Sequence, residues 1–189
     1  MDAWTCLTTR SSTPPAQLID PAPAGEELQD ILQTAMSVPD HALLHPMRFT
    51  IIQGEERERL GRVFEQALLR REPEADDNAR TKERGRPLRA PLIVALWASI
   101  TPDHPKTPAV EQVVTAGMGM QNILNALHVR GYGSIVLTGK HAHDPFVKTA
   151  LGLAEKDELV GFIYIGTPEN GVPAKPRSEV QRYLNRWNG

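Results

Sequence analysis

The chain has 189 residues, of which 40% are hydrophobic and 23% charged, a size and balance typical of one globular domain. Its formal net charge of −2 lacks the excess positive potential that attracts phosphate backbones, and its single cysteine, Cys6, excludes an intramolecular disulfide. No apolar run reaches the ~18 residues that cross a membrane, and no signal peptide is evident at residues 1–12. We therefore expect one domain over residues 1–189, a cytoplasmic location, no membrane segment and no nucleic-acid partner.

The first half of the chain predicts two helices and a strand. Residues 25–37 carry apolar side chains at helical spacing, and Pro39 ends this helix because proline disfavours helical geometry in the preceding residue. Residues 39–46 are predicted as a loop, 48–53 as a strand and 55–71 as an amphipathic helix. Residues 72–89 hold almost no large apolar side chain, which predicts a mobile segment or lid, or a solvated surface excursion without function.

The second half contains the most apolar segments. Residues 90–98 predict a buried strand, residues 101–108 a proline-rich loop, and residues 110–130 a long helix buried on most sides. Gly117 and Gly119 each cost this helix about 1 kcal/mol, so something should need the close approach that they allow. Residues 134–138 and 159–165 predict strands, and a helix begins at Asp144 and Pro145. This alternation predicts an α/β or α+β protein with helices covering a central sheet.

Common catalytic and metal-binding signatures are incomplete in this sequence. Gly117 and Gly119 imitate a dinucleotide fingerprint, but the third glycine is missing and the segment is a predicted helix. His41 and His45 lie in a loop without the glutamate of a zinc motif, and loop histidines such as His141 and His143 more often cap or face solvent. Cys6 has no neighbouring base and is expected to be a buried apolar residue. We expect no metal site.

Two short clusters are suited to binding an anion. Arg10, Ser11 and Ser12 combine a guanidinium with two hydroxyl groups, and Lys175 and Arg177 follow the last predicted strand. Several cations and hydroxyl groups can together satisfy the oxygen atoms of a phosphate. Either cluster alone is more often a solvated surface patch. A binding site is favoured only if another observation indicates that the two clusters act together.

The order and spacing of several segments supply that observation. They are Arg10 to Ser12, the stretch from Ile31 to Phe49 with Pro39 and His41, the helix ending at Gly131, and the strand from Val160 to Pro168. Together they resemble the FMN-dependent nitroreductase family, in particular its compact YdjA-like branch. The resemblance implies an α+β fold with α/β-type layers, in which helices flank a mixed, mainly antiparallel sheet, and an intertwined homodimer with FMN at the subunit interface.

The resemblance also implies which residues contact FMN. Arg10, Ser11 and Ser12 match positions at the phosphate and the pyrimidine edge, and Lys175 and Arg177 match a pair that closes on the phosphate. The loop with Pro39, Asp40 and His41 matches one that reaches the flavin of the partner subunit, and Ser37 stands where the compact branch has arginine. The end of a strand is expected to place backbone near flavin N5, at Val136, Leu137, Thr138 and Gly139.

The implied activity is an FMN-dependent oxidoreductase. NADH or NADPH would reduce the flavin, and a nitroaromatic, quinone or similar electron-poor acceptor would then take the electrons from it in a ping-pong cycle. No catalytic side-chain acid or base is required. The expected partners are a second copy of the chain and the small-molecule acceptor. The alternatives are an enzyme of the same fold with another acceptor, such as a dehydrogenase or reductive dehalogenase, and a flavin-binding dimer without catalysis.

Overall fold

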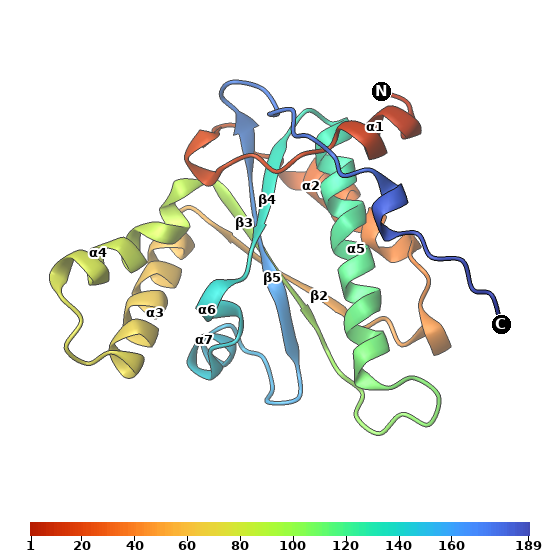
Figure 1. The fold of residues 1–189 in the computed structure, drawn as a ribbon. Coiled ribbons are helices and arrows are strands. Elements are labelled where there is room, and N and C mark those ends of the chain that lie inside the picture. The colour runs from red at the N-terminus through yellow and green to blue at the C-terminus, as the bar shows by residue number, and fades with distance from the viewer.

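The computed structural model describes residues 1–189 and shows an antiparallel sheet with helices on both faces (Figure 1). The strands are β1 (Leu18–Ile19), β2 (Met47–Gln53), β3 (Leu92–Ala98), β4 (Gly133–Leu137) and β5 (Glu158–Pro168). The helices are α1 (Ala3–Thr9), α2 (Gly25–Gln33), α3 (Glu55–Arg71), α4 (Asp77–Gly85), α5 (Ala109–Val129), α6 (Gly139–Ala142) and α7 (Pro145–Ala150). Short 3-10 helices are η1 (Pro15–Gln17), η2 (Thr34–Ser37), η3 (His41–Leu43), η4 (Arg86–Arg89) and η5 (Val180–Tyr183).

Strand β5 organises the sheet. It pairs with β3, with β4 and, at its C-terminal end, with the short β1, while β2 pairs with the other edge of β3. All these pairs are antiparallel, which confirms the predicted α+β class with a mainly antiparallel sheet. Strand β4 pairs only with β5, so its second edge is open for other contacts.

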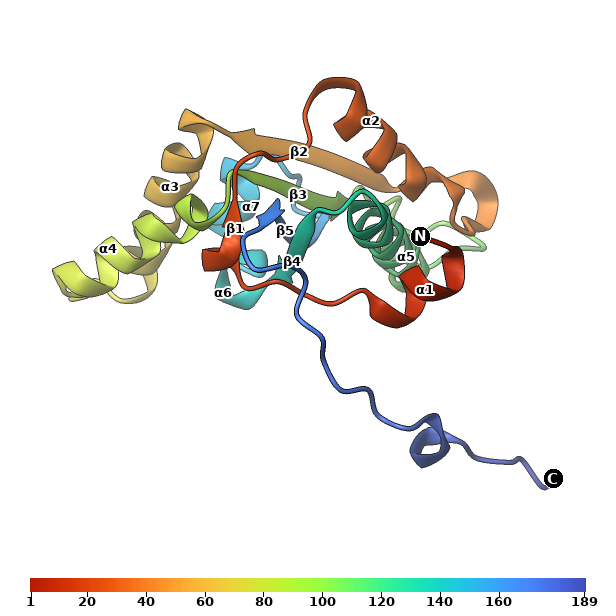
Figure 2. The same ribbon diagram turned by 90° about the horizontal axis from the view of Figure 1, so that it is seen from above.

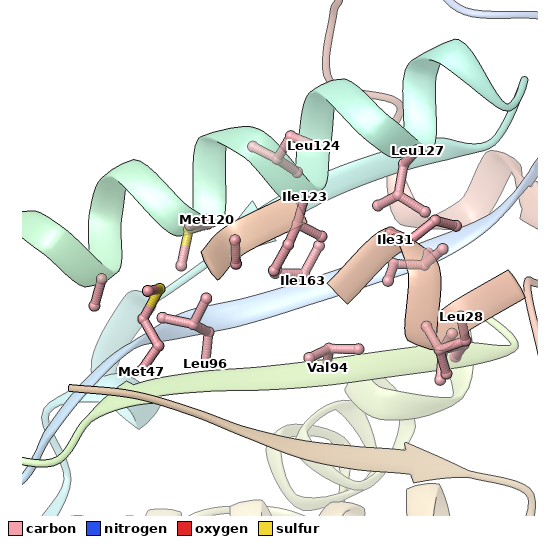
Figure 3. Packing of buried hydrophobic residues seen from close by; sticks show 14 of the residues in the cluster. Leu28, Ile31, Met47, Val94, Leu96, Met120, Ile123, Leu124, Leu127 and Ile163 are labelled. Atoms are coloured by element: carbon pink, nitrogen blue, oxygen red, sulfur yellow. The ribbon is translucent and has the colours of Figure 1, made fainter. Parts of the chain in front are cut away.

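Both faces of the sheet are buried, because alternate side chains of a strand point to opposite faces. On β3, Leu92, Val94 and Leu96 join the core beneath α2 and α5, whereas Ile93 and Ala95 join the core beneath α3 and α7. Figure 3 shows Met120, Ile123 and Leu127 of α5 above the first of these faces. The continuous apolar run that predicted this strand therefore serves two separate cores.

One of the two glycines in α5 permits a close contact. A Cβ at Gly119 would collide with Met47 Sδ and would lie 3.3 Å from Ala35 Cβ, which confirms the predicted close approach. A Cβ at Gly117 would meet no atom of this chain within 4 Å. Gly117 therefore leaves a shallow, open place on the outer face of α5.

Residues 72–89 were predicted to be a mobile segment or lid, or a solvated surface excursion; the structure shows them as largely helical, with no residue of α4 buried. These residues form α4 and η4, which pack against α3 (Figure 1). Glu65, almost fully buried on α3, accepts a hydrogen bond from Arg80 at 2.9 Å and pairs with Arg84 at 3.6 Å. The helix thus pairs two partly exposed arginines with one buried carboxylate, a contact that the search for large apolar side chains does not detect.

Close backbone contact at Gly61 holds the two helices together, and a substitution there tests it. A Cβ at this position would collide with the carbonyl oxygen of Arg84, so Gly61→Ala should lower the free energy of unfolding by roughly 1–3 kcal/mol. Gly85→Ala is the control, because a Cβ there meets nothing within 4 Å. Urea denaturation measures both variants, and equal stability of the two would contradict this packing.

The C-terminal residues beyond β5 leave the body of the molecule, as Figure 2 shows. Their apolar side chains are exposed, with Trp187 92% accessible and Tyr183 70%. Two cations nevertheless tie the start of this tail to the N-terminal segment: Lys175 Nζ donates to Ser12 O at 3.0 Å, and Arg177 donates to Arg10 O. Among all the helices, none combines the length and apolar character that a membrane span requires.

Candidate functional site

The open edge of β4 borders the segment with Arg10, Ser11 and Ser12. The Thr13 N–H donates to Ser134 O at 3.0 Å, so the backbone groups of Ser134 point away from β5. Because these groups alternate in direction along an antiparallel strand, those of Val136 and Thr138 point the same way. The N–H of Thr138 makes no hydrogen bond within the chain and its residue is exposed. A free backbone donor thus lies at the end of this edge.

Three cations converge near the beginning of the same edge. The hydrogen bonds from Lys175 and Arg177 to the carbonyl groups of Ser12 and Arg10 place both side chains beside the N-terminal segment. Burial and then the nearby charge of Arg177 lower the pKa of Arg10. The structure therefore joins two clusters that lie more than 160 residues apart in the chain, and their like charges would be stabilised by an anion.

Hydroxyl groups accompany these cations. Ser11 Oγ and Thr13 Oγ1 are buried without a hydrogen-bond partner, an arrangement that costs free energy unless a ligand or water supplies the partner. His128 lies close by and bonds Thr9 at 2.9 Å. Burial, followed by the charge of Arg10, lowers the pKa of His128, so this ring is neutral near pH 7. The cluster combines phosphate-binding donors with unsatisfied polar groups.

The two ends of the β4 edge are separated by the length of the strand. From Ser134 to Thr138 the backbone advances about 13 Å at the usual rise per residue. A Cβ at Gly161 of β5 would lie 2.9 Å from Val136 Cγ1 and 3.3 Å from Thr138 Cγ2, so the bare glycine lets the end of β4 lie close to β5. The edge therefore suits an elongated ligand with an anionic group at one end.

A cavity of about 660 Å³ opens where β4 ends. We call it the α4 cavity, because α4 and η4 form one wall and α3, α6 and the β5 side chains Phe162 and Tyr164 form the others. Val136, Leu137, Thr138 and Gly139 line it as well. Five cations face two carboxylates in its lining: Arg71, Lys82, Arg86, Arg89 and Lys140 against Glu72 and Glu83.

Residue His141 connects α6 to α4 across the α4 cavity. Its ring stacks on Phe64 with centroids 3.8 Å apart, and Nε2 lies 2.7 Å from Glu83 Oε2. Burial lowers the pKa of His141, and the hydrogen bond with Glu83 only partly opposes this. Burial alone would raise the pKa of Glu83, but hydrogen bonds from Arg86 and His141 lower it. The arrangement is therefore a neutral imidazole that donates to an ionised carboxylate.

This histidine makes stability depend on pH. Below its ordinary pKa of 6.5, the unfolded chain takes up a proton that folded His141 resists, so the free energy of unfolding should fall as the pH decreases. The loss attributed to Glu83 begins lower, below 4.5. Urea denaturation between about pH 7 and 5.5 measures the slope. The His141→Gln variant, which keeps a donor toward Glu83, should show a shallower slope, and an unchanged slope would refute the assignment.

The loop from Ser37 to His41 lies elsewhere, along α5. Ser37 Oγ donates to Thr34 O and lies 3.3 Å from Asn122 Nδ2, while Thr115 Oγ1 donates to Pro39 O at 3.5 Å. His41 Nδ1 lies 2.9 Å from Glu111 Oε2. In Figure 1 this loop lies on one side of α5 and α6 lies on the other. The structure thus divides the predicted flavin contacts of one chain into two groups.

Asp40 fixes the shape of this loop. Its buried carboxylate accepts hydrogen bonds from the backbone N–H groups of His45 at 2.7 Å and Leu44 at 3.3 Å. Ala42, Leu43 and His45 have positive φ angles of 64°, 52° and 46°, which non-glycine residues rarely adopt. Such strained conformations cluster at functional sites. Asp40 is therefore a structural residue of a loop that presents its neighbours to solvent.

Other candidate residues have structural contacts. Cys6 is 4% exposed and packs under α5, with Sγ 3.6 Å from Asn125 O, as expected of a buried apolar residue. Asp144 accepts the N–H groups of Phe146 and Val147 at the start of α7 and pairs with Arg71. Its capping position was predicted from the Asp-Pro sequence, whereas its pairing with Arg71 depends on the tertiary fold.

Comparison with known proteins identifies the family. The model of the nitroreductase family matches residues 19–167. The chain is also 40% identical over 169 residues to the Escherichia coli (strain K12) protein named "Putative NAD(P)H nitroreductase YdjA", and this match covers 89% of the chain and 90% of that protein. The chain belongs to the nitroreductase family. The resemblance inferred from the sequence is confirmed.

Solved structures of nitroreductases share the fold. A nitroreductase-like family protein from Bacillus cereus superposes with a TM-score of 0.84 at 20% identity, covering 100% of this chain and 97% of that one. A variant of NfnB from Sphigopyxis sp. strain HMH, described as an FMN and NADPH-dependent nitroreductase, gives 0.75 at 19% identity and covers 100% of both chains. At these identities the likeness concerns the fold alone.

Within this nitroreductase fold, sequence reasoning treated the arginine-rich residues 72–89 as a mobile segment or lid and did not predict that they form a wall of the α4 cavity. Lys82, Arg86 and Arg89 follow the spacing i, i+4, i+7 and all line the cavity. That spacing was visible in the sequence, but it was attributed to a mobile segment. His141 was expected to cap a helix or face solvent, but it is buried against Phe64 and pairs with Glu83, which lies 58 residues earlier and which no local pattern connects to it.

Proposed function

We propose that this nitroreductase is an FMN-dependent NAD(P)H oxidoreductase that reduces nitroaromatic, quinone or similar electron-poor acceptors. One observation supports it most: Arg10, Lys175 and Arg177 converge at one end of the open β4 edge, and the free N–H of Thr138 lies at the other. The edge offers a place for a phosphate and, further along, for a ring with hydrogen-bond acceptors. The named NAD(P)H and FMN dependence of relatives agrees with this assignment.

The residues present fit FMN. Arg10, Lys175 and Arg177 would bind the phosphate, which the unpartnered hydroxyl of Ser11 and the side chain of Ser12 would help to satisfy. Val136 and Leu137 would support the ring system, and the N–H groups of Thr138 and Gly139 would donate to its edge. Bound FMN would supply the hydride-transfer chemistry, and the protein would supply its position and electrostatics.

The reaction needs few contributions from side chains. The unpartnered Thr138 N–H would donate to bound FMN and would favour its reduced state electrostatically. The donor nucleotide leaves before the acceptor enters, so one open site serves both in a ping-pong cycle. No side chain needs to act as an acid, base or nucleophile. The carboxylates of Asp40 and Asp144 accordingly serve structural hydrogen bonds and an ion pair.

A homodimer would complete the site. The outer face of α5 exposes Val110 at 66% and Val114 at 54%, and Gly117 leaves room for a second copy to approach. Trp4 of α1 and the tail residue Trp187 are also exposed, and soluble monomers rarely expose so much apolar surface. The loop from Ser37 to His41 runs beside this face, in contact with Glu111, Thr115 and Asn122 of α5, so docking there would carry the loop toward the flavin of the other copy.

The visible spectrum of the purified protein tests this function. We expect a yellow protein, or one that turns yellow with added FMN, whose absorbance bleaches when NADH or NADPH is added without oxygen. A colourless protein that fails to bind FMN would refute the cofactor and with it the function. A yellow protein that neither nucleotide bleaches would favour a flavin-binding dimer without catalysis.

The acceptor is tested separately. Steady-state rates with nitroaromatics, quinones and halogenated aromatics distinguish a nitroreductase from a reductive dehalogenase of the same fold. We expect turnover of the first two classes, because the open β4 edge restricts the acceptor little and reduction by hydride or electron transfer does not require a halide-binding site. Turnover of only the halogenated compounds would contradict the proposal.

A further inference from the structure

The α4 cavity has a second, separate set of cations. Lys82, Arg86 and Arg89 line one wall, remote in the chain from the cluster around Arg10. Lys82 makes no ion pair or hydrogen bond within the chain. Arg86 uses Nε to bond Glu83 at 2.6 Å, and Arg89 uses Nε to bond Arg86 O at 3.1 Å. The ammonium group of Lys82 and the terminal nitrogen atoms of Arg86 are therefore free to bind a ligand, whereas the guanidinium group of Arg89 lies over the Tyr164 ring, 5.8 Å from its centroid.

The carboxylates of the cavity do not neutralise these cations. Glu83 accepts from both Arg86 and His141 through the same oxygen, Oε2, and Glu72 pairs with Lys140 at 3.3 Å. Arg71 pairs with Asp144, which lies outside the lining, so Lys82 and Arg89 are the lining cations that no carboxylate neutralises, and the cavity keeps a positive charge through them. The neutral ring of His141 adds no charge of its own. The wall of α4 and η4 thus presents positive charge to the interior of the cavity.

The opposite wall is apolar and aromatic. Val136 and Leu137 are half-buried there, and the rings of Phe64, Phe162 and Tyr164 form the floor. Burial raises the pKa of the Tyr164 phenol, so this group remains a neutral donor. The volume of about 660 Å³ falls in the range of small-molecule sites. The cavity therefore matches a flat apolar body that carries a negative group on one side.

We propose that the α4 cavity binds planar aromatic molecules with a negative charge, and that Lys82 and Arg86 bind the anionic group. Thr138 and Gly139 line the same cavity, so an occupant lies beside the backbone donors assigned to the flavin. This part rests on the proposed function: the enzyme then prefers such aromatic anions as acceptors of its electrons. Leu137 and the aromatic floor then hold the ring, and the cations select carboxylated acceptors over neutral ones.

Calorimetry with two matched probes tests binding without relying on turnover. Para-nitrobenzoate carries the negative charge, and para-nitrobenzamide has nearly the same shape without it. We expect the purified protein to bind the benzoate at least about tenfold more tightly, because charge-assisted hydrogen bonds to Arg86 and Lys82 form only with the anion. The preference should shrink at high salt, as the rim of the cavity is open to solvent. Equal affinities would overturn the proposal.

Two variants assign the preference to this wall. Lys82→Gln breaks no contact in the chain, and Arg86→Gln removes one guanidinium group, so each should weaken benzoate binding about tenfold and leave the benzamide unchanged. Arg62→Gln is the control, because this exposed α3 residue carries the same charge outside the cavity. The KM for the benzoate as acceptor should rise in parallel, with a smaller effect on kcat.

Other outcomes separate this inference from the proposed function. If Lys82→Gln and Arg86→Gln weaken FMN binding and not benzoate binding, the cations hold the cofactor and the inference fails. If they raise only the KM for NADPH, the wall binds the phosphate of the donor and the inference fails too. A protein that binds benzoate with the expected preference but takes up no FMN would instead refute the proposed function and leave the anion site standing.

Discussion

Replacing Arg177 by alanine is expected to weaken FMN binding by about 1.5–3 kcal/mol, or roughly ten- to hundredfold in Kd. The reason is the geometry of the cluster: Arg177 donates to the backbone carbonyl of Arg10, which holds its guanidinium group beside that of Arg10. The pKa of Arg10 is lowered by burial and by this neighbouring charge. A phosphate dianion would relieve the repulsion, so losing either cation removes a charge-assisted contact.

Arg10→Ala should show a loss of the same size, and the double variant should lose less than the sum, because the two side chains share one ligand. Arg182→Ala is the matched control, since this arginine also lies on the exposed tail but forms no ion pair. Quenching of FMN fluorescence on binding gives the dissociation constants. Unchanged affinity in both Arg10→Ala and Arg177→Ala would remove the phosphate site from the proposed function.

Replacing Val114 by glutamate is expected to convert a dimer into monomers that lose FMN. Val114 is 54% exposed on α5, one turn after the exposed Val110 and one turn before Gly117. Docking a second copy on this face would bury the new carboxylate without a partner, at a cost of several kcal/mol. Light scattering measures the mass, and FMN absorbance after gel filtration measures retention, because the loop with Ser37 and His41 would no longer reach the other copy.

Ile51→Glu is the control for this variant. Ile51 is 44% exposed on β2 and undergoes the same chemical change away from α5. We expect it to stay dimeric and yellow. A Val114→Glu protein that remains a dimer with bound FMN would show that copies associate through another face, and a monomeric wild-type protein that binds FMN tightly would refute the completed interfacial site.

The α4 segment illustrates where sequence reasoning failed. Its scarcity of large apolar residues predicted mobility, but the structure stabilises it by pairing Glu65 with Arg80 and Arg84 and by the close contact at Gly61. An ion pair between residues on different helices leaves no periodic apolar pattern. For the same reason the roles of Lys82 and Arg86 were not predicted, because their spacing places them on one side only when the segment is helical and faces a cavity.

The sequence by itself determined the elements and the family. Periodic apolar residues predicted α3 and α5 and the apolar run predicted β3, because burial of one face or of both faces imposes a local pattern on the chain. Family membership likewise depends on the order of local segments. The resemblance already assigned Arg10 and Arg177 to one phosphate, whereas only the tertiary structure decided that Arg177 donates to the Arg10 carbonyl, that Thr138 ends an open edge and that His141 meets Glu83. These contacts join distant parts of the chain, and the sheet register and helix packing that create them are global properties.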